Sequence, residues 1–206
     1  MEHSTNSITL RGSLRELPQF SHENHGRRFF RFLLEVPRLS GAVDLLPVIT
    51  EELLLNRIDL SGGEMLTVTG QIRSYNQRSD GVRHLMIFVF AATITAEDGA
   101  PVNDVVLEGS LCKEPTFRRT PLGREICDAM LAVPRAFRRA DYLPCILWGR
   151  TAQEVSACHT GERIRICGRL QSRIYTKLTE EGPLERTAYE ISALTAEILT
   201  DDSEDL

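Results

Sequence analysis

The chain has 206 residues, of which 42% are hydrophobic and 26% charged, and its net charge is −5. This composition is typical of a globular protein and excludes a disordered or fibrous one. The longest apolar run, 85–92, is too short to span a bilayer, and the N-terminus lacks the basic start and apolar core of a secretory signal. We therefore expect a soluble protein of the cytoplasm with no membrane partner.

An internal repeat organises the chain. Shifted by 97 positions, residues 6–49 match residues 103–146, and identical Val-Pro-Arg, Leu-Pro and Gly-Arg runs recur in both. Two copies are too few for a solenoid, so the pattern indicates two similar domains. We predict a first domain at 1–97, a linker at 98–102, a second domain at 103–199 and a short acidic tail at 200–206.

Each repeat is predicted to consist mostly of strands. In chain order, alternating apolar and polar residues indicate a first strand at 8–14 and 105–111, and a second at 30–36 and 127–133. A third follows at 44–50 and 141–148, then a short helix at 51–58 and 151–159. A fourth strand at 64–74 and 162–177 and a fifth at 82–95 and 186–199 complete the repeats. This element order predicts an all-β protein of two tandem OB-folds, which are five-stranded Greek-key barrels.

The fourth strand of the second repeat has the strongest functional signal. Its inward positions are apolar, whereas its outward positions hold five cations, a tyrosine and no acid: Arg163, Arg165, Arg169, Arg173, Lys177 and Tyr175. The net charge of the whole chain hides this basic region, because residues 103–178 hold 13 Lys and Arg against 8 Asp and Glu, a net of +5. A basic surface without a ligand is the alternative interpretation.

Aromatic residues accompany these cations in and before the third strand. Alternation places Tyr142 and Trp148 on one side of the strand, Phe137 precedes it, and basic residues flank the segment at Arg135, Arg138 and Arg150. Aromatic rings on a basic sheet give nucleobases a stacking surface, while arginines contact phosphates. Trp148 alone would fit a barrel core equally well, but the combination favours nucleic-acid binding.

Three runs of the second repeat follow a known pattern: Asn103-x-Val105-x-Leu107-x-Gly109-x-Leu111, Leu147-Trp148-Gly149-Arg150 and Gly168-Arg169-Leu170-Gln171-x-Arg173-x-Tyr175. In register across 103–198, they resemble the bacterial single-stranded DNA-binding proteins. The resemblance implies an OB barrel that coats single-stranded DNA without sequence preference, in replication, recombination or repair, and near the nucleoid. It places the stacking aromatics at Phe137, Tyr142, Trp148 and Tyr175. Because family members assemble four OB units, it also implies a homodimer of this tandem chain.

The first repeat departs from this pattern. Opposite the four aromatics it has Ser40, Leu45, Glu51 and Gln77, and opposite the four arginines of the fourth strand it has Met65, Thr67, Gln71 and Tyr75. We therefore expect a degenerate binding face, and a first repeat that supports assembly or covers part of the surface. The candidates for a minor contact patch with nucleic acid in the first repeat are Arg27, Arg28, Arg31 and Phe29.

The C-terminus also departs from the family. In the family, an acidic tip closing in Pro-Phe recruits replication and repair enzymes, whereas this chain ends in Asp205-Leu206. Docking of such partners through this tail is therefore not favoured, and a solvated acidic end is the simpler interpretation.

The remaining chemistry argues against catalysis. Five cysteines occur without a Cys-x-x-Cys pair, so no metal site is predicted, and no cofactor is implied. The sequence also has no Ser/His/Asp set and no phosphate-binding glycine loop at usable spacing, so we expect no enzyme. The alternative function is an OB-fold protein-interaction factor, such as a replication-restart or mobile-element accessory protein with weak nucleic-acid binding.

Overall fold

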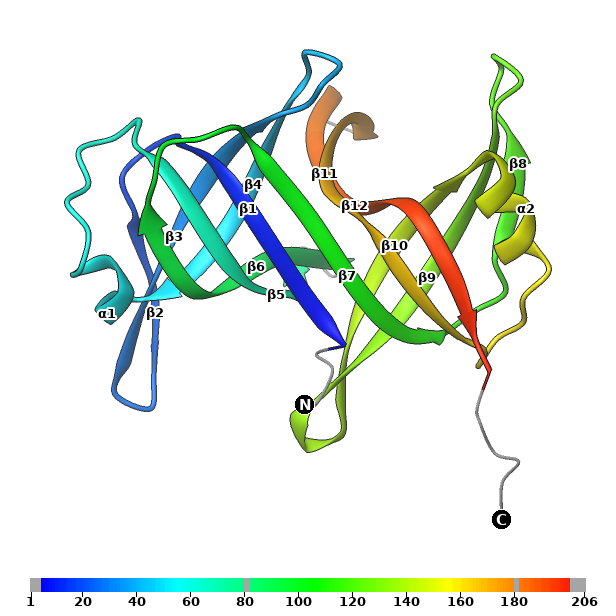
Figure 1. Cartoon of the computed structure of the whole chain (residues 1–206), viewed down its shortest axis with the longest axis horizontal. Coiled ribbons are helices and arrows are strands. Elements are labelled where there is room, and N and C mark those ends of the chain that lie inside the picture. Colours follow the sequence, from blue (N-terminus) through cyan, green and yellow to red (C-terminus); the bar gives the residue numbers. More distant parts are fainter. Residues whose placement is uncertain (1–4, 80–81, 180–181, 201–206) are drawn as a thin grey trace. The chain divides into compact units, whose positions relative to one another are not determined.

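The computed structural model describes residues 5–79, 82–179 and 182–200 (Figure 1). These residues form twelve strands, two short α-helices and one 3-10 turn, which confirms the predicted all-β class. By contacts the chain divides into two compact units, described separately below. One comprises Met1–Asn6, Val105–Arg169 and Ile191–Leu206, and the other comprises Ser7–Asp104 and Leu170–Glu190.

The first barrel is a sheet closed on itself. Its strands are β1 (Asn6–Leu14), β2 (Gln19–Asn24), β3 (Arg27–Pro37), β4 (Val43–Glu51), β5 (Met65–Ser79) and β6 (Val82–Ala96). They lie in the order β2-β3-β4-β6-β5-β1, and pairing of β3 with β1 closes the barrel. Helix α1 (Glu52–Leu55) lies between β4 and β5. Apart from the short β2, this is the predicted OB order.

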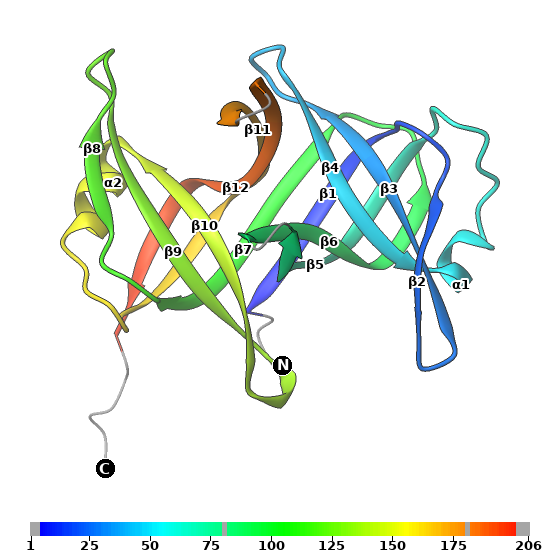
Figure 2. The same ribbon diagram turned by 180° about the vertical axis from the view of Figure 1, so that it is seen from behind.

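The second barrel repeats this arrangement (Figure 2). Its strands are β7 (Val102–Leu111), β8 (Thr116–Arg119), β9 (Glu125–Arg135), β10 (Arg139–Trp148), β11 (Arg163–Thr179) and β12 (Gly182–Leu199). Their order is β7-β11-β12-β10-β9-β8, with β7 paired to β9 at the closure. The 3-10 turn η1 (Ala136–Arg138) joins β9 to β10, and helix α2 (Gly149–Ser156) follows β10.

The interior of each barrel is filled by matching residues. The leucine pairs Leu10 and Leu107, Leu34 and Leu131, and Leu46 and Leu143 are all 0% exposed, which confirms the predicted inward positions. Where each barrel closes, Gly12 and Gly109 lie directly against the carbonyl oxygens of Glu35 and Ala132. A side chain there would collide with backbone, so close strand contact explains the shared glycines.

Several elements differ from the sequence prediction. Strands β2 and β8 were not predicted, because their residues are almost all exposed and show no alternation of burial. Helix α1 covers 52–55 rather than 51–58, and α2 covers 149–156 rather than 151–159. Gln171, which alternation places on the outward side of β11 with Arg169 and Arg173, is buried, and its amide donates to Glu190 at 2.7 Å. No helix among the described residues is long and apolar enough to cross a membrane.

Both barrels bury an aspartate beside an arginine at the same repeat position. Asp141 and Arg135 lie 3.3 Å apart in the second barrel, and Asp44 accepts two hydrogen bonds from Arg38, at 2.5 and 2.7 Å, in the first. Both carboxylates are fully buried. A buried carboxylate requires such a partner because the interior solvates charge poorly. The Asp44 carboxylate correspondingly raises the pKa of Arg38.

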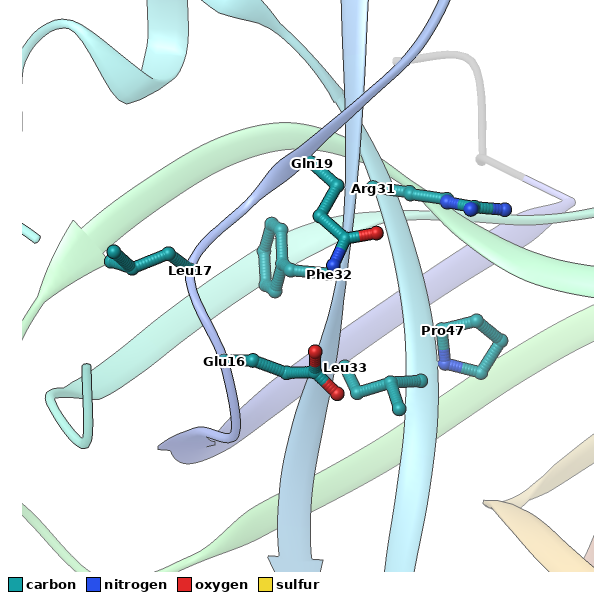
Figure 3. Close-up of a pocket in the computed structure, with 7 residues that line it drawn as sticks. All are labelled: Glu16, Leu17, Gln19, Arg31, Phe32, Leu33 and Pro47. Carbon is teal, nitrogen blue, oxygen red and sulfur yellow. The ribbon is translucent and has the colours of Figure 1, made fainter.

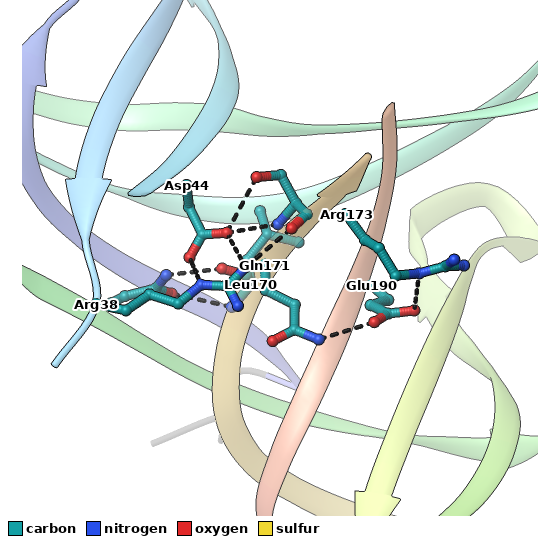
Figure 4. A network of polar contacts seen from close by, with 8 residues as sticks. Arg38, Asp44, Leu170, Gln171, Arg173 and Glu190 are labelled. Carbon is teal, nitrogen blue, oxygen red and sulfur yellow. Dashed lines mark hydrogen bonds and ion pairs between the residues drawn. The ribbon is translucent and has the colours of Figure 1, made fainter. Parts of the chain in front are cut away.

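The Asp44 pair also holds the outer part of the β11–β12 hairpin, residues 170–190, which we call the arm. Asp44 accepts hydrogen bonds from the backbone N–H of Ser172 at 2.6 Å and from its hydroxyl at 3.1 Å, while Arg38 donates to the Ser172 carbonyl at 2.9 Å (Figure 4). The amide of Asn103 makes two further bonds with the backbone of Leu170, at 2.7 and 2.9 Å. The start of the arm, at Leu170 and Ser172, is therefore bound to the first barrel by part-buried polar contacts.

Replacing Asp44→Asn should destabilise the protein by roughly 3 kcal/mol, because Arg38 loses its counter-charge in a largely buried position. Ser172→Ala should cost about 1 kcal/mol, since only one of the three bonds to Ser172 involves its hydroxyl. Urea unfolding of both variants measures the difference. Equal, small losses would show that the Asp44 charge contributes nothing to stability.

Candidate nucleic-acid interface

The β9–η1–β10 hairpin presents three of the predicted aromatic residues. In β10, Leu143, Cys145 and Leu147 point into the core, so the alternating side chains point outward. Tyr142 is 46% exposed and Trp148 38% exposed. Both side chains are therefore partly exposed on the outside of the barrel.

Phe137 lies in η1 at the tip of this hairpin. Its side chain is 93% exposed, and both Phe137 and Arg138 adopt positive φ angles, of 60° and 54°. This conformation is unfavourable for residues with a side chain, and such strain is concentrated at functional sites. The tip therefore displays one aromatic ring and one exposed cation in solvent.

The arginines around this hairpin fall into two kinds. Arg138 is exposed, and Arg150 at the start of α2 makes only an exposed ion pair with Glu154 at 2.8 Å. Exposed pairs of this type are weak, so a phosphate can displace the carboxylate. Arg135 is different, because its guanidinium contacts the buried Asp141. We therefore expect Arg138 and Arg150 to be more available to a ligand than Arg135.

The cations of β11 are also unequal. Arg165 lies between Glu108 of β7, at 2.6 Å, and Glu197 of β12, at 3.1 Å, and hydrogen bonding to Glu108 raises the pKa of Arg165. The outward side of β11 itself carries no acid, as the sequence indicates. Acidic residues of the neighbouring strands β7 and β12 nevertheless contact this side. Arg163 is exposed, whereas Arg169 is half-buried and its Nε has no hydrogen-bond partner among the described residues.

The last predicted residues belong to the arm and hence to the compact unit of the first barrel. The guanidinium of Arg173 lies 5.7 Å from the ring centre of Tyr175, a cation–π contact, and 3.9 Å from Glu190. Tyr175 is 37% exposed. The side chain of Lys177 and the acidic residues 201–206 lie outside the described residues.

Sequence reasoning missed one basic residue beside the aromatic hairpin. Pairing of β8 with β9 sets Arg118 opposite Ile126, and pairing of β9 with β10 sets Ile126 opposite Trp148. Directly opposed residues share a sheet face, so Arg118 and Trp148 lie on the same side. Arg118 also contacts Asp128 at 2.5 Å. The signal in the sequence was the run Phe117-Arg118-Arg119, but β8 itself was not predicted.

Burial accounts for three of the five cysteines of this barrel. Cys127, Cys145 and Cys158 are buried and all five cysteines of the chain are free thiols. Desolvation raises the pKa of Cys127 to about 11 and raises that of Cys158. At neutral pH these groups are therefore neutral, apolar packing side chains rather than nucleophiles.

The family model and the similar proteins all point to one protein family. Residues 102–199 match the model of the single-strand binding protein family. The chain is 38% identical over 87 residues to single-stranded DNA-binding protein B of Bacillus subtilis, covering 39% of this chain and 75% of that protein. It is 40% identical over 81 residues to single-stranded DNA-binding protein A of the same organism, covering 36% of this chain and 47% of that protein. The chain thus spans three quarters of the first relative and about half of the second.

Solved structures extend the similarity to both repeats. The wild-type single-stranded DNA binding protein from Thermus aquaticus superposes with a TM-score of 0.80 over 98% of this chain and 96% of that chain, at 22% sequence identity. A deletion mutant of the same protein superposes with a TM-score of 0.79. At this identity the likeness concerns the fold, which is shared over the whole chain.

Arg150 and Arg165 are expected to differ in their contribution to the salt dependence of binding. Arg150→Ala should lower affinity for oligo-dT and flatten the dependence of log K on log salt by about 0.7, because one phosphate contact is lost. Arg165→Ala should leave that slope unchanged, because Glu108 and Glu197 already neutralise it. Fluorescence titration at several salt concentrations measures both slopes. A flatter slope for Arg165→Ala would contradict the assignment.

Proposed function

The chain belongs to the single-strand binding protein family, and on that premise we propose that it binds single-stranded DNA without sequence preference through the surface of its second barrel. The observation that carries the proposal is the set of exposed rings of Phe137, Tyr142 and Trp148 on one hairpin. Rings of this kind stack on any base, because every base has a π-face. Such a surface favours binding without sequence preference.

Two physical contributions account for the binding. Stacking selects unpaired bases, because the faces of bases in a duplex are covered by their neighbours. Contacts from arginine to phosphate add affinity that falls with salt, since bound cations are released from the strand. We assign stacking to the aromatics named above with Tyr175, and phosphate contact to Arg138, Arg150, Arg163, Arg169, Arg173 and Lys177.

The proposal implies binding and protection without chemical change of the strand. We place this activity in replication, recombination or repair, where single strands are exposed, and therefore in the cytoplasm in association with the nucleoid. The domain boundaries predicted from the repeat, and docking of replication or repair proteins on the acidic tail, stay predictions.

A second candidate function is an OB-fold protein-interaction factor. It is favoured by the ion pairs that neutralise Arg165 and by the loss of the family's aromatics from the equivalent positions of the first repeat. It is disfavoured by the exposed aromatic hairpin and its basic surroundings. The two functions differ in whether an oligonucleotide alone contacts this hairpin.

The proposed function predicts a fluorescence change on binding. Trp148 is the only tryptophan, so titration with oligo-dT should quench the emission of the full-length protein saturably, whereas duplex DNA should not. Tyr142→Ala should weaken binding by about 1–3 kcal/mol and leave the salt slope nearly unchanged, because it removes stacking and no charge. Absence of quenching together with absence of a gel shift would favour the protein-interaction function.

We also propose that the protein is a homodimer presenting four OB units. The mass of one chain is 23.2 kDa, so light scattering after gel filtration should give twice that mass. The mass should not change with protein concentration in the micromolar range, because an obligate assembly of this kind does not dissociate readily. A monomeric mass would contradict the proposal.

A further inference from the structure

One acidic residue of the arm contacts two residues of the opposite strand. Glu190 of β12 accepts a hydrogen bond from the amide of Gln171 at 2.7 Å through Oε1, and its Oε2 lies 3.9 Å from Nε of Arg173 (Figure 4). Gln171 is buried and the side chain of Glu190 is 15% exposed, whereas that of Arg173 is 59% exposed. Glu190 therefore joins a buried position of the arm to an exposed cation.

The cation beside Glu190 lies over an aromatic ring. Gln171, Arg173 and Tyr175 are alternate residues of β11, so their side chains lie on one side of the strand. The guanidinium carbon of Arg173 is 5.7 Å from the centre of the Tyr175 ring, and Tyr175 is 37% exposed. A cation over the face of a ring is attracted by the quadrupole of the ring. Glu190, Arg173 and Tyr175 thus form a series of contacts from a mostly buried position to solvent.

The backbone next to Arg173 is also held in place. The N–H of the preceding residue, Ser172, donates to the buried Asp44 at 2.6 Å, and Arg38 donates to the Ser172 carbonyl at 2.9 Å. The hydrogen bond with Asp44 raises the pKa of Arg38, and the nearby charge of Glu190 adds to this rise. Main-chain and side-chain contacts therefore both determine where Arg173 lies.

The first barrel has no acid at the position of Glu190. Pairing of β4 with β6 and of β10 with β12 aligns Phe88 of β6 with Glu190 of β12, and Tyr75 is the counterpart of Arg173 in the repeat. Tyr75 and Phe88 meet edge to face with 5.9 Å between their ring centres. The same two positions are in contact in both barrels, as two rings in the first and as an acid and a cation in the second. Packing of the barrel alone therefore does not account for a charge at Glu190.

The contact with Glu190 prepares Arg173 for an anion. A carboxylate close to a bound phosphate would by itself weaken binding through repulsion. Contact at Nε offsets this repulsion, because it leaves the two terminal nitrogens of the guanidinium to donate to a phosphate. It also restrains a long side chain before the strand binds, so that less rotamer freedom is lost on binding.

We propose that Glu190 is a positioning residue for single-strand binding, which holds the guanidinium of Arg173 above the ring of Tyr175 so that a phosphate and a neighbouring base bind together. Glu190 itself does not contact the strand. This inference rests on the proposed function, because that function assigns phosphate contact to Arg173 and stacking to Tyr175. It gives an acid a favourable effect on the binding of an anion, which is opposite in sign to the effect of its charge alone.

The test combines Glu190→Gln with Arg173→Ala in the full-length protein, singly and together. Glutamine keeps an acceptor for Gln171 but carries no charge for Arg173. Repulsion alone predicts that Glu190→Gln binds oligo-dT more tightly, whereas positioning predicts that it binds roughly fivefold more weakly. In the Arg173→Ala background the same substitution should cause no further loss, because the group that Glu190 positions is absent. Quenching of Trp148 measures the affinity, and circular dichroism and urea unfolding confirm that each variant is folded.

Two other glutamates are matched controls for the loss of one negative charge. Glu197 also lies on β12 beside an arginine of β11, at 3.1 Å from Arg165. Glu16 lines a pocket of about 300 Å³ with Leu17 and Arg31 in the compact unit that contains the arm (Figure 3). It makes no ion pair within the described part of the chain. Glu197→Gln and Glu16→Gln should bind oligo-dT as tightly as the wild type or more tightly.

Glu190→Asp separates the charge from its position. It keeps the carboxylate but withdraws it from Arg173 by one methylene, so it should bind more weakly than the wild type although the net charge is unchanged. This loss should also vanish in the Arg173→Ala background. Both Glu190 variants should flatten the dependence of log K on log salt by up to about 0.7, because the phosphate contact of Arg173 is weakened. If Glu190→Gln does not fold, Glu190→Asp carries the test.

Affinity of a folded Glu190→Gln protein equal to or above that of the wild type overturns the inference and leaves the proposed function intact. An equal loss in the presence and absence of the Arg173 side chain also overturns it, because Glu190 then acts through another group. Failure of the wild-type protein to bind oligo-dT refutes the proposed function, and the inference with it.

Discussion

Closure of each sheet into a barrel is the constraint on which the rest of this structure depends. A closed barrel gives each strand of its wall one face in the core and one face in solvent. A shift of such a strand by one residue would turn its apolar side chains out of the core. In each barrel the closing strands meet at a glycine, which is Gly12 in the first barrel and Gly109 in the second. The lack of a side chain there lets the two backbones come into contact. Three interior leucines recur in both repeats, and each is fully buried. Other core positions differ in identity but stay buried, as Phe32 and Ala129 do, whereas outward positions can also change in charge.

The tolerance of outward positions to change accounts for two different surfaces on one scaffold. In the second barrel, Phe137, Tyr142 and Trp148 lie on one hairpin and its tip. In the first barrel, the exposed Tyr75 and the half-buried Phe88 and Phe90 lie on the outer sides of β5 and β6. A residue can move from one outward position to another at little cost in core packing. Loss of an aromatic from an equivalent position is consequently weak evidence that a barrel has lost affinity for nucleic acid.

The fold could be predicted well from the sequence, because apolar and polar residues alternate along the strands and because the same alternation occurs in both repeats. The outward positions of Tyr142 and Trp148 followed from the same alternation. What the sequence could not supply was pairing between distant strands. Glu108 and Glu197 reach Arg165 from strands far along the chain, and Phe88 and Phe90 join Arg31 only through the register of four strands. The burial of Gln171 likewise depends on Glu190, a residue of another strand.

The bonds between Asp44 and Ser172 join a segment of the second repeat to the first barrel. As a result, residues 170–190 complete the compact unit of a domain encoded some 70 residues earlier. A tandem duplication can ordinarily revert by deletion of one copy. Here, deleting the second copy would strip the first of a packed segment and leave the carboxylate of Asp44 buried beside a vacated position. Binding of the arm to the first barrel therefore makes loss of one copy costly to the stability of the other.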